Sequence, residues 1–251
     1  DRIVSADAAG DIIFWDAATA VVLQVTSMPF SKVIAISFSP DGEFFVVTNA
    51  EGFAFQHRTK NIHDDQCPFT PSNTAHSRCE MRAVAWTPDS TQYICGYERG
   101  QVKSAHKDGP DGSDDAPCDF LHLGRSADII NALAISPDGF SVAVAGGREM
   151  RELGNGVWVR GFVAVYNSAN YTLRWKEWVE PEHDGNVASL SFSFDGKQLV
   201  SAGDDKYVRM WDPRDGSRLK AFRQYELPIP RRHSSEYYPS EVSASIKAAA
   251  L

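Results

Sequence analysis

Short runs in which apolar and polar residues alternate recur four times along the chain. They occupy Val33–Phe38, Ala83–Trp86, Ala132–Ile135 and Ala188–Phe192. A period of two places successive side chains on opposite faces of an extended strand, so each run predicts a β-strand that buries one face. The pattern therefore predicts a chain made mainly of β-strands.

A tight-turn signal follows each alternating run. Pro-Asp-Gly follows the first and third runs, Pro-Asp-Ser the second and Phe-Asp-Gly the fourth. These residues favour turns because proline presets φ, aspartate bonds to the local backbone, and glycine accepts a positive φ. A second apolar stretch follows each turn, at residues 44–47, 93–95, 142–144 and 199–201. Each copy therefore predicts a β-hairpin.

The repeat is long enough to hold more than one hairpin. The turn aspartates of successive copies lie 48, 49 and 57 residues apart, at Asp41, Asp89, Asp138 and Asp195. The last copy continues into two more apolar stretches, Tyr207–Trp211 and Arg218–Phe222. Four short antiparallel strands in a repeat of about 45 residues are typical of a propeller blade. One such sheet cannot bury both of its faces, so neighbouring sheets must stack on it.

The stretch His183–Asp212 resembles one complete WD repeat. A histidine stands near its start, Phe-Asp-Gly forms its first turn, Ser201 to Asp205 follow its second strand, and Trp-Asp closes its third strand. The opening stretch from Ile3 to Asp16 is similar to the second half of another repeat. The resemblance implies an all-β fold, a β-propeller of four-stranded antiparallel blades. It has about five blades or is part of a larger propeller, seven-bladed or tandem.

This resemblance divides the chain into blades and a tail. WD-repeat blades span residues 1–224, as a half-blade at 1–27 and blades at about 30–78, 79–126, 129–180 and 183–224. Residues 225–251 form a tail with a further strand expected at 241–248. This strand either completes the N-terminal half-blade and closes a ring, which leaves no open sheet edge, or begins a further blade.

The family resemblance also implies a buried hydrogen-bond relay in the last full copy. Its members are His183, Ser201, Asp205 and Trp211. Buried polar groups must be paired, or each costs about 1–3 kcal/mol, so such a relay is expected to be kept whole or lost together. The first copy keeps Ser5 and Trp15 but has Ala9 in place of the aspartate.

Two other copies lack the relay altogether. Val47, Glu51 and His57 occupy its serine, aspartate and tryptophan positions in one, and Cys95, Arg99 and Ala105 do so in the next. We expect these blades to be held together mainly by apolar packing.

Composition and charge narrow the possible partners. The net charge is -8 and the pI is about 5.4, which argues against nucleic acid or an anionic membrane, because both bind basic surfaces. No apolar run approaches the roughly 20 residues that span a bilayer. Four scattered cysteines do not form a disulfide framework. An intracellular protein is expected, cytoplasmic first, with cytoskeletal, ciliary or nuclear locations open.

Two long connections contain metal-ligand residue types. His63, Cys67, His76 and Cys79 resemble zinc-ligand spacing, but the paired-cysteine half-site is missing, and a plain surface loop explains them as well. Residues 107–119 hold five aspartates, but their spacing differs from a calcium-binding EF-hand and favours a solvated loop. We therefore expect no metal and no cofactor.

A third connection, from Arg148 to Gly161, interrupts the fourth copy between its second and third strands. It is expected to be a loop on a face where partners of this family commonly bind. Arginine and tryptophan are frequent in binding hot spots. The candidate partner-binding residues are Arg148, Arg151, Trp158 and Arg160. The alternative is that Trp158 folds back and covers a neighbouring blade.

No catalytic motif with a fitting context is present. The sequence lacks Gly-x-Ser-x-Gly, a phosphate-binding glycine loop, His-Glu-x-x-His and a dinucleotide fingerprint. The chain is therefore expected to be a non-catalytic scaffold for other proteins, as a subunit of a larger intracellular assembly. A reader of peptides or modified residues is the alternative, and a five-bladed propeller hydrolase is a further one.

Overall fold

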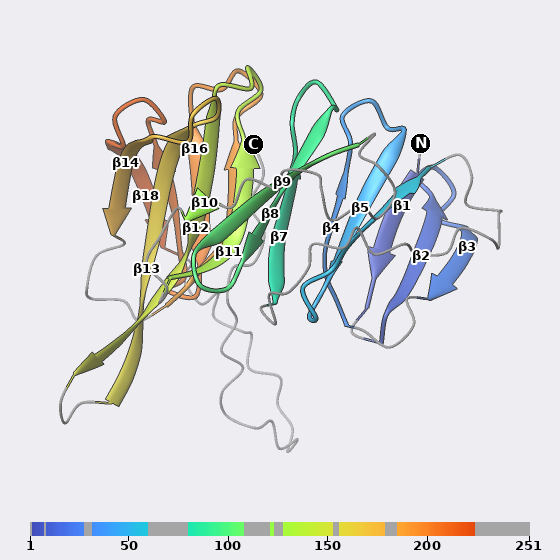
Figure 1. Ribbon diagram of the computed structural model, residues 1–251, viewed down its shortest axis with the longest axis horizontal. Coiled ribbons are helices and arrows are strands. Elements are labelled where there is room, and N and C mark those ends of the chain that lie inside the picture. The colour runs from blue at the N-terminus through green and yellow to red at the C-terminus, as the bar shows by residue number, and fades with distance from the viewer. Residues whose placement is uncertain are drawn as a thin grey trace, which may run out of the picture.

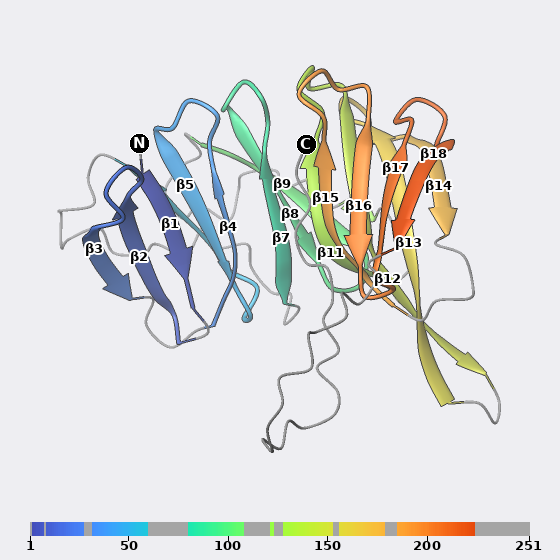
Figure 2. The ribbon, with the colours of Figure 1, turned by 180° about the vertical axis from the view of Figure 1, so that it is seen from behind.

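The regular structure is a row of antiparallel β-sheets. The computed structural model describes residues 2–7, 9–27, 32–59, 80–107, 121–122, 128–152, 156–178 and 185–223. Within these residues every regular element is a strand, and the strands form five sheets. The sheets pack side by side in a row, in the order of the chain (Figures 1 and 2). The predicted all-β fold is confirmed.

Each sheet is built from strands that are consecutive in the sequence. The first sheet contains β1 (Arg2–Ala6), β2 (Asp11–Asp16) and β3 (Val22–Ser27). The second contains β4 (Val33–Phe38), β5 (Phe44–Asn49) and β6 (Ala54–Arg58). The third contains β7 (Met81–Trp86), β8 (Gln92–Tyr97), β9 (Gln101–His106) and β10 (Leu121–His122).

The last two sheets have four strands each. The fourth contains β11 (Asp128–Ile135), β12 (Ser141–Glu152), β13 (Gly156–Asn167) and β14 (Leu173–Trp178). The fifth contains β15 (Val187–Phe192), β16 (Leu199–Gly203), β17 (Tyr207–Trp211) and β18 (Arg218–Arg223). In every sheet each strand pairs with the next one along the chain, so the connections do not cross over other strands.

The repeated turn motif closes the first hairpin of the last four sheets in the same way. A hydroxyl two residues before the aspartate donates to its carboxylate at 2.5 to 2.7 Å, and accepts a backbone N–H from the start of the next strand. The hydroxyl bond is the main cause that lowers the pKa of each carboxyl: Asp41, Asp89, Asp138 and Asp195. The residue after each aspartate has a positive φ, and Ser90 is the one of the four that is not glycine.

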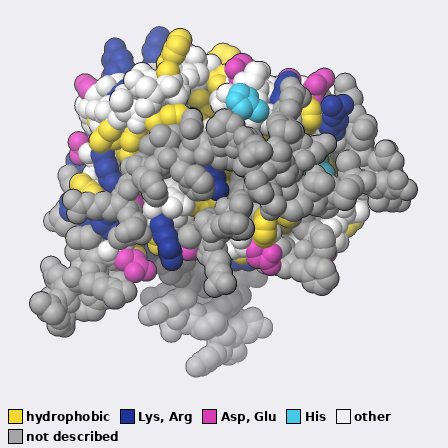
Figure 3. All heavy atoms as spheres, in the orientation of Figure 1, with side chains coloured by type: hydrophobic (Ala, Val, Ile, Leu, Met, Phe, Trp, Pro, Cys, Tyr) yellow, Lys and Arg dark blue, Asp and Glu magenta, His cyan; other side chains and the backbone are white. Residues whose placement is uncertain are grey.

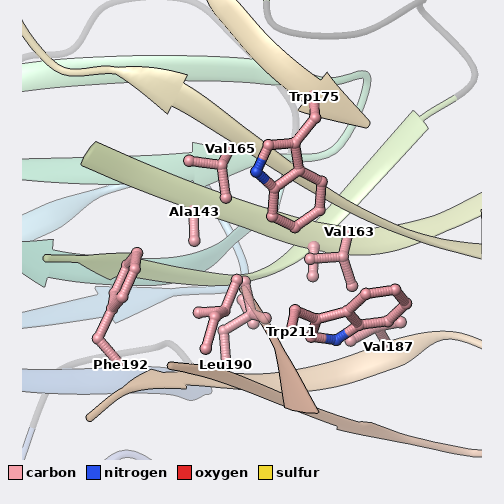
Figure 4. Close-up of a cluster of buried hydrophobic side chains, with 11 residues drawn as sticks. Ala143, Val163, Val165, Trp175, Val187, Leu190, Phe192 and Trp211 are labelled. Carbon is pink, nitrogen blue, oxygen red and sulfur yellow. The ribbon is translucent and has the colours of Figure 1, made fainter. Parts of the chain in front are cut away.

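Apolar side chains fill the space between neighbouring sheets. Four buried clusters join the first sheet to the second, the second to the third, the third to the fourth and the fourth to the fifth. In the last of these, Trp175 of β14 lies 6.2 Å from Trp211 of β17, between ring centroids (Figure 4). Since each sheet buries both faces only where it has two neighbours, stacking holds the row together.

Hydrogen bonds also link neighbouring sheets near their turns. The Ser90 hydroxyl accepts the backbone N–H of Asp41 at 3.0 Å, which joins the third sheet to the second. The indole of Trp86 donates to the carbonyl of Ser37 at 3.1 Å across the same interface. These bonds fix the height of one sheet relative to the next, because apolar packing alone has little directionality.

The connection expected as a loop between the second and third strands of the fourth copy is instead β-structure. Strands β12 and β13 stay paired from Ser141 opposite Asn167 to Glu152 opposite Gly156. Their far ends leave the sheet and project from the row as a two-stranded arm (Figures 1 and 2). Continuous ladder hydrogen bonds across Val157–Val159, a β-branched and aromatic run, account for the extension.

Candidate partner-binding site

The arm begins where Arg148 of β12 lies directly opposite Arg160 of β13. Both arginines are partly buried, and both come from the connection that the sequence had marked for partner binding. Their side chains lie on the face of the fourth sheet that points toward the third, because Phe162, two residues beyond Arg160, packs there.

Trp178, at the end of β14, is the centre of this site. The guanidinium carbon of Arg148 lies 4.7 Å from the centroid of its ring, and that of Arg160 lies 5.0 Å away. The ammonium nitrogen of Lys176 lies 4.6 Å from the same centroid and 4.2 Å from that of Phe162. Three cations thus surround one indole, whose negative π-face attracts them. We call Arg148, Arg160, Lys176 and Trp178 the arm-base cluster.

A single buried carboxylate neutralises part of this charge. Asp128, at the start of β11, is fully buried and forms ion pairs with Arg148 and, at 3.1 Å, with Lys176. Burial by itself raises the pKa of the Asp128 carboxyl, but the hydrogen bonds from these two cations outweigh burial, and the net pKa lies below the ordinary value. Burial and the charge of Asp128 raise the pKa of Tyr166 to about 12. Asp128 is therefore ionised at neutral pH.

Arg160 differs from the other two cations. Within the residues that the structure describes it takes part in no ion pair, and its Nε is buried without a hydrogen-bond acceptor. Its backbone forms a parallel bridge with Gly185, which ties the arm base to the start of the fifth sheet. Stacking on Trp178 is the one interaction shown for its guanidinium in the described part of the chain.

Sequence reasoning named two members of the site and missed three residues. It named Arg148 and Arg160 but not Lys176, Trp178 and Asp128. Lys176 and Trp178 are alternate residues of one strand and so share a face, a signal that was available. Asp128 carried no such signal, since its pairing depends on how β11 aligns with β12.

The other two candidate residues lie farther out on the arm. Arg151 pairs with Val157, and Trp158 pairs with Met150, in the register of β12 and β13. The side chains of Arg151 and Trp158 lie outside the described part, so the question of whether Trp158 covers a neighbouring sheet stays open.

Two members of the predicted relay are hydrogen-bonded to each other in the fifth sheet. The Trp211 indole N–H donates to the Ser201 hydroxyl at 2.9 Å. Asp205 does not join this pair through a hydrogen bond that the structure shows. It accepts the backbone N–H of Tyr207 at 3.0 Å and forms an ion pair with Arg209. His183, the fourth expected member, lies outside the described residues.

The first sheet repeats this tryptophan–serine pair. The Trp15 indole N–H of β2 donates to the Ser5 hydroxyl of β1 at 2.8 Å. Two sheets at opposite ends of the row therefore contain the same local interaction at equivalent positions.

Comparisons with known proteins agree with this geometry. A family model described as "WD domain, G-beta repeat" matches residues 176–212, the segment that contains Ser201, Asp205 and Trp211. Residues 176–212 therefore resemble one WD repeat.

Curated relatives share parts of this sequence. The chain is 41% identical over 49 residues to Topless-related protein 4 of Arabidopsis thaliana, which is 19% of this chain and 4% of the relative. It is 27% identical over 120 residues to WD repeat-containing protein 1 of Xenopus tropicalis, 44% of this chain and 18% of the relative. It is 27% identical over 115 residues to TOPLESS-RELATED PROTEIN 2 of Oryza sativa subsp. japonica, 45% of this chain and 9% of the relative. These matches span less than a fifth of the length of each relative.

In the second and third sheets, apolar and aromatic side chains occupy the positions at which the relay was expected. His57, at the tryptophan position of the second sheet, stacks on Phe45 with ring centroids 5.1 Å apart. Burial lowers the pKa of His57 to about 4. Val47, at the serine position, is fully buried, and Cys95, at that of the third sheet, is nearly so.

The zinc candidates His63, Cys67, His76 and Cys79 lie outside the described residues. Among the residues that are described, no three His, Cys, Asp or Glu side chains form a group able to hold a metal ion. The described part also contains no helix long and apolar enough to cross a membrane.

Proposed function

We propose that this chain is a non-catalytic scaffold for protein–protein interactions within a larger intracellular assembly, and that the arm of β12 and β13 contacts a partner. One observation carries the proposal: the arm extends beyond an otherwise regular row of sheets, and its base brings three cations together around Trp178. WD-repeat proteins generally serve as platforms for other proteins. Arginine and tryptophan are the residue types most frequent in interface hot spots.

The surface near the arm fits this role. Lys and Arg side chains reach the surface over the half of the molecule that holds β13 and β14, with Asp and Glu side chains among them (Figure 3). The chain as a whole has a net charge of -8, so the group of three cations around Trp178 is a local feature rather than a consequence of composition. Local charge of this kind favours one partner surface over others.

We further propose that the five sheets are blades of a β-propeller that continues beyond them. In the fifth sheet the face that carries Trp211 is buried against the fourth sheet. The equivalent face of the first sheet carries Trp15 and has Ile3 54% exposed, with no described sheet packed on it. The first and fifth sheets also lie at opposite ends of the row (Figures 1 and 2). Both observations favour the arrangement in which the five sheets are part of a larger propeller, and they argue against a closed five-bladed ring.

Deletion of residues 241–251 distinguishes these two arrangements. If the strand expected at 241–248 pairs with β1 to close a ring, the deletion exposes a sheet edge and lowers the melting temperature. We expect the melting temperature to stay unchanged, because we propose that this strand begins a further blade and does not pair with β1. Deletion of residues 249–251 alone is the matched control.

Affinity purification tests the scaffold itself. The tagged chain is expected to retain specific proteins from its native source, and Trp158→Ala is expected to reduce the retention of at least one of them several-fold. A matched substitution away from the arm, Phe140→Ala, removes an exposed aromatic side chain on the turn before β12. If Trp158→Ala retains every protein as the unmodified chain does, the arm is not the contact. If the unmodified chain retains none, the scaffold proposal fails.

A further inference from the structure

The arm-base cluster holds more cations than the described part of the chain neutralises. Arg148 and Lys176 share the one carboxylate of Asp128, while Arg160 has no ion pair among the described residues. The Nε atom of Arg160 is buried and lacks an acceptor. A buried donor without a partner costs about 1–3 kcal/mol, more when it is charged, so the cluster is poised to gain from an added acceptor.

The arrangement of the cluster selects the kind of acceptor. Arg148 and Arg160 stand opposite each other in the hairpin, and both stack on the Trp178 ring. Stacking restricts the orientation of a guanidinium but leaves the N–H groups at its edge free to bond in its plane. A carboxylate accepts two such N–H groups at once, which is the geometry that arginine favours.

We propose that the arm-base cluster binds an acidic segment of a partner polypeptide, with a carboxylate of that segment paired to Arg160. This inference rests on the proposed scaffold function and names the chemistry of its partner. Asp128 keeps Arg148 and Lys176 beside Trp178, and so holds the site in shape before the partner arrives. The side-chain exposures of 16% for Arg148 and 17% for Lys176 fit this positioning role.

The overall charge of the chain makes the site selective. A net charge of -8 repels an acidic segment over most of the surface, so attachment depends on this local group of cations. Partly exposed charge pairs are screened by salt, and the affinity is therefore expected to fall as the salt concentration rises. A nucleic acid carries far more negative charge and is disfavoured by the same net charge.

Fluorescence anisotropy of a labelled hexaglutamate peptide tests the inference. The unmodified chain is expected to bind this peptide, and to bind a labelled hexaglutamine peptide at least tenfold more weakly. Arg160→Gln is expected to weaken hexaglutamate binding about tenfold, since one charge-assisted pair is lost. Arg160→Lys keeps the charge but loses the paired N–H groups, so a smaller loss is expected.

The control variant is Arg174→Gln, which makes the same charge change at the opposite end of β14 and should alter binding less than twofold. Thermal melts of each variant establish that it is folded. Equal binding of both peptides, no effect of Arg160→Gln, or an equal effect of Arg174→Gln overturns the inference. Stronger binding of a labelled oligonucleotide than of hexaglutamate also overturns it.

Affinity purification tests the scaffold proposal separately from the acidic-segment inference. If Arg160→Gln retains the same proteins as the unmodified chain in affinity purification, while Trp158→Ala loses some, the scaffold stands and the acidic-segment inference fails. If the unmodified chain binds hexaglutamate but retains no protein, the site stands as a peptide site and the scaffold proposal fails.

Discussion

Trp211 donates its indole N–H to the hydroxyl of Ser201 across two neighbouring strands, and both side chains are buried. The tryptophan also fills the space between the fourth and fifth sheets, where it packs beside Trp175. Trp211 therefore stabilises the fifth sheet through a hydrogen bond and also packs that sheet against the fourth.

Trp211→Ala is expected to destabilise the chain by about 3 kcal/mol or more, because it opens a large cavity and leaves the Ser201 hydroxyl without its donor. Ser201→Ala removes only the hydrogen bond and is expected to cost about 1 kcal/mol. Urea unfolding of both variants measures the difference. A Trp211→Ala variant that unfolds at the same urea concentration as the unmodified chain contradicts this account.

Asp128→Asn is expected to cost about 3 kcal/mol, because it leaves Arg148 and Lys176 without their shared negative charge in a buried place. The matched control is Glu177→Gln, an exposed residue of β14 next to Lys176, which should change stability by less than about 0.5 kcal/mol. Urea unfolding again gives the comparison. Equal stability of the two variants would show that the buried ion pairs contribute little.

Substitution by alanine is expected to destabilise the chain at two glycines, for different reasons. Gly42 has a φ of +68° and open space around it, so Gly42→Ala should cost only the backbone strain, about 1–2 kcal/mol. A Cβ at Gly146 would lie 1.8 Å from the carbonyl oxygen of Ile129, beside the bulge in β11. Gly146→Ala must therefore move backbone and should cost clearly more. Thermal melts that rank the two variants the other way round would contradict this.

His57 is expected to make the chain less stable in mild acid. The unfolded chain binds a proton at His57 near pH 6.5, but the folded chain does so only near pH 4, because burial lowers the pKa. The stability that neutral His57 contributes is complete above pH 6.5 and is lost as the pH falls toward about 4. The expected loss between pH 7 and pH 5 is about 1–2 kcal/mol.

His57→Phe removes this titration and keeps a ring to stack on Phe45. Urea unfolding at pH 7 and at pH 5 should therefore show a smaller difference for the variant than for the unmodified chain. The turn aspartates do not disturb this comparison, because their pKa values lie below 3.8, under the measured range. An unchanged pH dependence in His57→Phe would exclude His57 as its source.

The repeating hairpins could be read from the sequence because their causes are local. Alternation in Val33–Phe38 and the Pro-Asp-Gly turn that follows predict strands and a turn that the structure confirms as β4, β5 and the Ser39–Asp41 bond. Only side chains within a few residues of each other take part. The arm was missed for the opposite reason, since its long ladder depends on pairing Arg148–Glu152 with residues of β13 that the sequence places in a loop.

The sequence by itself determined that this chain consists of repeated antiparallel hairpins, because period-two alternation and turn chemistry act over short distances. Only the tertiary structure decided that Arg148, Arg160 and Lys176 meet around Trp178, and that Asp128 forms ion pairs with two of the three. These residues come from four strands, and their meeting depends on strand register and on where the arm leaves the sheet. The buried ion pairs of Asp128 depend on that arrangement, and no pattern along the sequence predicts them.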